Sequence, residues 1–138
     1  MSGTSEMDEV NDKGKAFVLE ERIAGFASRA IAVCEALPGK LGAEHIRDQL
    51  FRASTSVAAN YAEASVPESR KGFVHKMGVA RKELVEARMW LKIIELREYI
   101  DAERLMPLMK ETDELIRIFH SSISTARRRI REEKAASK

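Results

Sequence analysis

GFVHKMGVARKELVEARMWLKIIE, residues 72–95, carries apolar side chains on two opposite sides of one predicted helix. The first set recurs at intervals of three and four residues, which at about 100° per residue places its members on one helix face. This set comprises Phe73, Met77, Ala80, Leu84, Ala87, Leu91 and Ile94. Because such a stripe must be buried against other helices, the stretch predicts a helical bundle.

Three other parts of the chain have the same spacing and contain few Gly or Pro residues. Their stripes run from Leu19 to Leu37, from Ile46 to Ala64 and from Leu108 to Ile130. No alternation of apolar and polar residues lasts long enough to predict a strand. We therefore expect an all-α protein.

Short breaks separate the four stretches, at residues 38–42, at 65–69 and near 99–101. Because connections of about two to six residues join helices that are antiparallel neighbours, the breaks predict an up-down-up-down four-helix bundle.

Two prolines affect where the third and fourth helices begin. Ser65 and Glu68 have the spacing of a capping box, and Pro67 is tolerated in a first turn, so the third helix is expected to begin at 66–69. Pro107 would remove a hydrogen bond from a helix interior. Either the fourth helix begins there, or a short turn after Asp101 precedes it.

The chain of 138 residues has room for one domain with a hydrophobic core. We expect a disordered acidic tail at 1–15, the bundle at 16–131 and a C-terminal tail at 132–138. No apolar run approaches the roughly 18 to 20 residues that cross a bilayer, and the first residues lack a hydrophobic signal segment. The expected location is the cytoplasm, without a membrane partner.

The back of the quoted stretch is also apolar. Val85, Met89, Ile93 and Leu96 lie opposite the first stripe, and Phe51 leads a smaller set on the preceding helix. Each such side chain left in water forgoes roughly 1.5 to 3 kcal/mol of burial, and a single bundle offers only one core. These residues therefore predict an interface between copies of the chain. The alternative is that the bundle wraps far enough to cover both stripes.

The second helix carries polar residues in its core-facing arc. A buried amide without hydrogen bonds costs roughly 1 to 3 kcal/mol, so Asn60 is expected to find a partner in the backbone, in water or in a polar side chain. The predicted cluster comprises Ser54, Ser56, Asn60, Glu83, Glu86 and Trp90. We interpret it as a structural cluster that fixes the helix register, with a ligand site as the alternative.

Basic residues gather in two places, although 24 basic residues face 22 acidic ones in the whole chain. One acid-free run opens the third helix, and the other group closes the fourth. The candidate nucleic-acid-binding residues are Arg70, Lys71, Lys76, Arg81, Lys82, Arg127, Arg128, Arg129 and Arg131. Such clusters can engage a phosphate backbone, or they can be a solvated helix face.

No residue pattern indicates catalysis, a cofactor or a metal. A di-iron bundle needs Glu-x-x-His motifs, which are absent, and His45, His75 and His120 lie on three separate predicted helices without ligand spacing. Cys34 lies on an apolar stripe and is expected to be a small core residue. We therefore expect a protein that is not an enzyme.

Three segments together resemble one known family. They are QLFRASTSVAANYAEA (49–64), GFVHKMGVARKELVEARMWLKIIE (72–95) and ETDELIRIFHSSISTARRR (111–129). With the Ser56-Val57-x-x-Asn60 pattern, the Glu83 and Glu86 pair and Trp90-Leu91, they resemble the 23S rRNA-intervening sequence protein family. This family includes relatives of the accessory variability protein of diversity-generating retroelements. The resemblance covers about residues 17 to 130.

This resemblance implies an antiparallel four-helix bundle and, in several members, a homopentamer around a central pore. It implies less about activity, although the retroelement accessory protein binds a reverse transcriptase and nucleic acid through a basic surface. Because the charges here nearly balance, binding would depend on local clusters. We expect a non-catalytic homo-oligomeric scaffold that binds RNA or DNA weakly. The alternative is an adaptor that contacts a protein, such as a reverse transcriptase, without binding nucleic acid.

Overall fold

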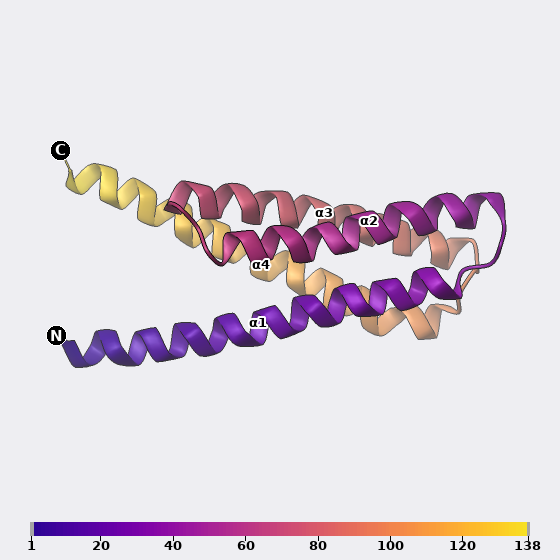
Figure 1. Cartoon of the computed structure of the whole chain (residues 1–138), viewed down its shortest axis with the longest axis horizontal. Coiled ribbons are helices and arrows are strands. Elements are labelled where there is room, and N and C mark those ends of the chain that lie inside the picture. Colours follow the sequence, from indigo (N-terminus) through magenta and orange to yellow (C-terminus); the bar gives the residue numbers. More distant parts are fainter. Residues whose placement is uncertain (1, 138) are drawn as a thin grey trace.

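Four amphipathic helices joined by short turns form the computed structural model, an antiparallel bundle (Figure 1). The structure describes the backbone of residues 2–137 and the side chains of residues 13–137. The helices are α1 (Ser2–Ala36), α2 (Leu41–Ala64), α3 (Arg70–Leu96) and α4 (Ala102–Ala136). The described backbone contains no strand, which confirms the all-α class. In Figure 1 the chain reverses direction at each turn, as an up-down-up-down bundle requires.

The predicted stripes form the core. On α3, every member from Met77 to Ile94 is fully buried, while Phe73 is partly buried at the start of the helix. On α4, Phe119 is fully buried and Ile130 lies at the edge, partly exposed. Thr112 is a buried polar residue that the spacing missed, and its hydroxyl donates to the Leu108 carbonyl at 2.7 Å.

The start of α3 differs from the prediction. The helix begins at Arg70, and Ser69 is its N-cap, because the Ser69 Oγ accepts the Gly72 N–H at 3.0 Å. The predicted capping box is therefore wrong. Ser65 instead donates to the Ala62 carbonyl at 2.7 Å, at the end of α2. A serine lies at each end of this turn, and spacing alone selected the wrong one.

The start of α4 also differs. The helix begins at Ala102 and continues through Pro107, so neither sequence-based alternative for this proline holds. A proline five residues after the first helical position removes one bond, the one that the Glu103 carbonyl would accept. Glu103 and Pro107 are both exposed, so water can reach this carbonyl.

The tail boundaries predicted at residues 15 and 131 are not helix ends in the structure. α1 already begins at Ser2, and α4 continues to Ala136. The predicted disorder of residues 1–15 falls mostly on side chains outside the described residues, and it stays a prediction.

The bundle is closed more tightly along one side than along the other. Helices α2 and α3 have the most extensive contact, whereas α1 and α4 have the least. Arg22 on α1 bridges this weaker side by pairing with Glu111 at 2.5 Å and with Glu114 at 3.1 Å, both on α4. Beyond this bridge, the start of α1 and the end of α4 diverge in Figure 1. Within the described part of the chain, no helix combines the length and apolar character needed to span a membrane.

Candidate nucleic-acid interface

The two basic clusters of the sequence meet at one end of the bundle. Arg70 opens α3, and its Nη2 lies 2.8 Å from the Glu133 carboxylate near the end of α4. Lys71 and Lys134 line the same shallow hollow. We call this surface the basic end, formed by Arg70, Lys71, Arg127, Arg128, Arg129, Arg131 and Lys134. Its assembly follows from the antiparallel topology, which places the start of α3 beside the end of α4.

Most cations of the basic end remain available to a ligand. Arg128 Nε lies 3.7 Å from Glu132 one turn away, a distance and exposure at which an ion pair contributes little. Among the side chains of residues 13–137, no carboxylate lies within 4.0 Å of Lys71, Arg127, Arg129 or Arg131. The surface therefore carries locally uncompensated positive charge.

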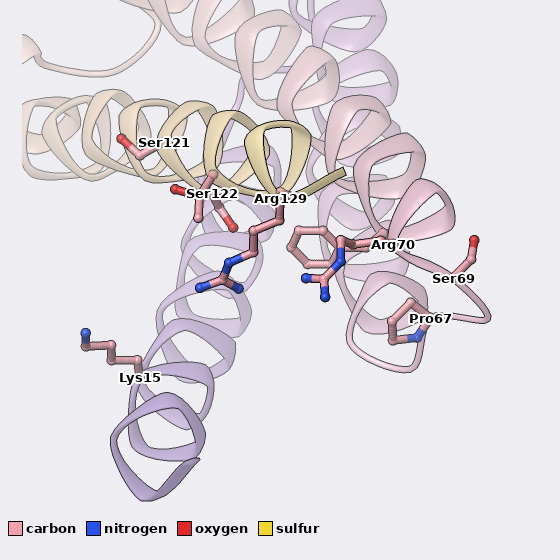
Figure 2. Close-up of a pocket in the computed structure, with 10 residues that line it drawn as sticks. Lys15, Pro67, Ser69, Arg70, Ser121, Ser122 and Arg129 are labelled. Atoms are coloured by element: carbon pink, nitrogen blue, oxygen red, sulfur yellow. The ribbon is translucent and has the colours of Figure 1, made fainter. Parts of the chain in front are cut away.

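A pocket of about 830 Å³ opens beside the basic end, between the diverging ends of α1, α3 and α4. Figure 2 shows Arg70 and Arg129 extending from different helices into this space, with Lys15 on α1 across from them. The remaining lining residues are Pro67, Ser69, Phe73, Ser121, Ser122, Thr125 and Ala126. Sequence reasoning missed Lys15 and the three α4 hydroxyls, because no local pattern connects positions so far apart in the chain.

The other predicted basic residues of α3 lie on different sides of the helix. Lys76 pairs with Glu63 of α2 at 2.5 Å, whereas the Arg81 Nη1 lies 3.1 Å from the His120 Nδ1 of α4. Lys82 is exposed. The acid-free run therefore does not form one continuous patch with the basic end.

The predicted polar cluster separates into two parts. Asn60 donates to the Ser56 carbonyl at 2.9 Å and to the Ser56 Oγ at 3.1 Å, and Ser54 donates to the Phe51 carbonyl at 3.2 Å. These bonds all lie within α2. The idea that Asn60 fixes helix register through α3 is therefore not supported by any hydrogen bond to that helix.

Glu83, Glu86 and Trp90 form the second part, together with a residue that the sequence did not single out. Arg52 on α2 pairs with Glu83 at 3.1 Å and also with Glu86, and this hydrogen bond to Glu86 raises the pKa of the Arg52 guanidinium. The Trp90 Nε1 donates to the same Glu86 carboxylate at 3.1 Å. This network joins α2 to α3 through one guanidinium shared by two carboxylates, so we interpret it as a structural contact.

The predicted interface residues mostly lie on the surface of the single chain. Leu96 is 69% exposed and Met89 58%, and Phe51 and Val85 are about half exposed. Ile93 is partly buried and packs against the core, so it contributes less to the outer face than its spacing predicts. The bundle therefore does not wrap around to cover this second stripe.

Cys34 lies in the core. It is 2% exposed, its Sγ lies 3.5 Å from the Arg47 carbonyl, and burial raises the pKa of the thiol to about 11. His45 packs edge-on against Trp90, with the ring centroids 5.9 Å apart. Across the described side chains, no group of three or more His, Cys, Asp or Glu residues is placed to hold a metal ion.

Comparisons with known proteins add a family and a fold. The sequence model of the family described as 23S rRNA-intervening sequence protein matches residues 18–121. The fold is similar to a crystal structure from Bacteroides thetaiotaomicron of a protein with unknown function from the S23 ribosomal protein family. That match has 28% sequence identity and a TM-score of 0.71, and covers 76% of this chain and 97% of the other. The comparison with curated proteins gives no match.

Proposed function

The chain belongs to the 23S rRNA-intervening sequence protein family, and from this premise we propose that it is a non-catalytic, homo-oligomeric helical scaffold that binds RNA or DNA through its basic end. The observation that carries the proposal is the 2.8 Å contact between Arg70 and Glu133, which joins two distant basic segments into one surface. The family match ends at residue 121, before the arginines of α4. The binding proposal therefore depends on this chain's own geometry.

Phosphate contacts explain why such a surface binds without base recognition. Each Lys or Arg that neutralises a phosphate releases a condensed counterion, which favours binding most at low salt. The nearly balanced total charge limits this effect to the basic end. We expect weak binding, with a dissociation constant of about 1 to 100 μM at modest salt, as is typical of nonspecific contacts.

Titration of fluorescent single-stranded RNA and duplex DNA tests this proposal. Replacing Arg127, Arg128 and Arg131 by Ala is expected to weaken binding and to lower the salt dependence by about 0.9 per lost duplex contact. A matched control replaces Lys40, Arg104 and Lys110 by Ala, which removes the same charge from exposed positions elsewhere. Equal losses in both triple variants, or no binding by the wild type below about 100 μM, would contradict the proposal.

Self-association is supported by the exposed apolar face that Val85, Met89 and Leu96 form on α3, whereas the half-exposed Phe51 lies on the side of α2 that faces α1. Contiguous apolar surface of this kind on a protein in water is typical of an interface. We propose a homo-oligomer, with a pentamer as the form that the family resemblance implies.

Light scattering at micromolar concentration measures the assembly directly. The wild type is expected at a multiple of its 15.6 kDa chain mass. Met89→Glu with Leu96→Glu is expected to dissociate it, because charges are costly to bury without partners. Leu41→Glu, at an 87% exposed position on the first turn of α2, is the control and should leave the mass unchanged. A monomeric wild type would refute self-association.

A second candidate function uses the same apolar face for a different protein. In this reading the chain is an adaptor, for instance for a reverse transcriptase, and its relation to the retroelement accessory proteins is part of the proposal. A monomeric wild type that binds no nucleic acid would favour it. Both proposals place the protein in the cytoplasm and assign it no catalytic step.

A further inference from the structure

We propose that the pocket between α1, α3 and α4 binds one nucleotide through its phosphate group. The nucleotide has two possible sources, a free mononucleotide or the 5′-phosphorylated end of a strand. This inference deepens the proposed nucleic-acid binding, because it names the group that the basic end recognises and the place where it is held.

Two arginines supply the phosphate donors. Arg70 and Arg129 come from different helices and line the same pocket, where their like charges disfavour one another unless an anion lies between them (Figure 2). Glu133 occupies only one end of the Arg70 guanidinium, at Nη2. A guanidinium has five N–H donors in a planar fork that matches phosphate oxygens, so donors remain on Arg70 and all remain on Arg129.

The start of α3 adds to the positive electrostatic potential of the pocket. Ser69 and Arg70 line the pocket at the N-terminus of a 27-residue helix, where the backbone carries partial positive charge. Lys15 supplies a further cation from α1. Three helices thus contribute positive charge to one space.

Three hydroxyl groups of α4 offer further hydrogen bonds. Ser121, Ser122 and Thr125 line the pocket, and among the described residues none of their side chains hydrogen-bonds to another group. Thr112, on the same helix, by contrast donates to its own backbone. Hydroxyls can donate to phosphate or exchange bonds with a ribose, so they suit a ligand larger than an inorganic ion.

The remaining lining of the pocket is apolar, which indicates that the ligand carries an aromatic base in addition to its phosphate. Phe73, Pro67 and Ala126 line the pocket, and Phe73 is partly buried against the core. An aromatic face binds a nucleobase by stacking without regard to its identity. The volume of about 830 Å³ lies within the range of small-molecule sites, and it far exceeds what a lone phosphate fills. Phosphate donors beside an apolar, aromatic surface therefore point to a nucleotide.

Calorimetric titration of the full chain with uridine 5′-monophosphate, uridine and inorganic phosphate tests the pocket. The monophosphate is expected to bind about tenfold or more tightly than either fragment, because only it uses both parts of the pocket. Arg129→Gln is expected to weaken the monophosphate about tenfold or more. Arg117→Gln, at an exposed position on the same helix that neither lines the pocket nor belongs to the basic end, is the matched control and should bind as the wild type does.

Phe73→Leu separates the two parts of the site while keeping an apolar side chain against the core. It is expected to weaken the monophosphate severalfold and to leave inorganic phosphate unchanged. Equal affinity for uridine and its monophosphate, no binding of the monophosphate, or equal losses for Arg117→Gln and Arg129→Gln would each overturn the inference.

A short RNA with a 5′-phosphate, compared with the same strand ending in a 5′-hydroxyl, distinguishes the sources. A preference for the phosphate that Arg129→Gln abolishes supports the strand end. Binding of the monophosphate without this preference supports a free nucleotide. If the 5′-hydroxyl strand binds while the monophosphate does not, this inference fails and the proposed nucleic-acid binding stands. If the monophosphate binds while neither strand does, this inference stands and the proposed nucleic-acid binding fails.

Discussion

The two ends of the bundle are built differently. At the closed end, the turns at 37–40 and 97–101 lie over the core, and Leu37 and Ile100 within them are buried. The fit is close there, because a Cβ added to Gly42 would lie 2.9 Å from the Tyr99 hydroxyl. At the open end, α1 and α4 diverge (Figure 1), and Phe17 on α1 is 63% exposed.

This difference assigns the two ends different roles: the closed end stabilises the fold, and the open end offers a surface for binding. Buried side chains at the closed end contribute to the free energy of unfolding, whereas the open end leaves apolar and charged groups accessible. Sites that bind ligands are commonly drawn from such less tightly packed regions. The comparison therefore predicts that changes at the closed end act on folding and changes at the open end act on binding.

The largest expected effect on stability contrasts Leu105 with Phe17. Leu105 is 1% exposed, so Leu105→Ala is expected to lower the free energy of unfolding by about 2 to 5 kcal/mol. Phe17→Ala is expected to change it by less than about 0.5 kcal/mol, because that side chain is largely in water. Urea denaturation measures both. A loss of about 2 kcal/mol or more for Phe17→Ala would show that the open end is covered in solution.

The reactivity of the Cys34 thiol tests how tightly the closed end is packed. Burial raises the pKa of its thiol from 9.0 to about 11, so at about pH 8 the thiolate fraction falls about 100-fold. Alkylation by iodoacetamide is expected to be slower by at least that factor in the native protein than in urea. The sign follows because the fold favours the neutral thiol, so this contribution to stability is present below about pH 9 and is lost as the pH rises through about 11. Similar native and unfolded alkylation rates would refute the closed packing.

The smallest expected effect concerns the ion pair that joins α1 to α4 next to the point where these helices diverge. Arg22 and Glu111 form a partly buried charged pair, and this hydrogen bond raises the pKa of the Arg22 guanidinium. A double-mutant cycle with Arg22→Met and Glu111→Gln is expected to give a coupling of about 1 kcal/mol. The exposed Arg128 and Glu132 pair is the control, with a smaller coupling expected. Equal couplings would show that the bridge has no special role.

Helix faces could be predicted from the sequence because burial follows a fixed period. The 3.6-residue repeat placed Leu84, Leu91 and Phe119 in the core, and all three are fully buried. The helix starts were less predictable. Ser65 and Ser69 are both acceptable caps, and the choice between them depends on tertiary packing across the turn, which spacing does not contain.

Partners across helices were the least predictable feature. Glu83 and Glu86 were recognised, yet their partner Arg52 lies 31 positions from the first of them, on α2. The sequence indicated that Asn60 needs hydrogen bonds, but not that Ser56 in the preceding turn supplies them. The pocket required three helices to be placed together, so only its individual cations were visible beforehand.

Because the start of α1 and the end of α4 lie at the same end of the bundle, any polypeptide attached to either one emerges at the end that holds the pocket (Figure 1). An affinity tag or a fluorescent fusion placed there would crowd the opening and compete with incoming molecules. An insertion in the turn after α1, at the exposed Gly39, would instead project from the opposite pole.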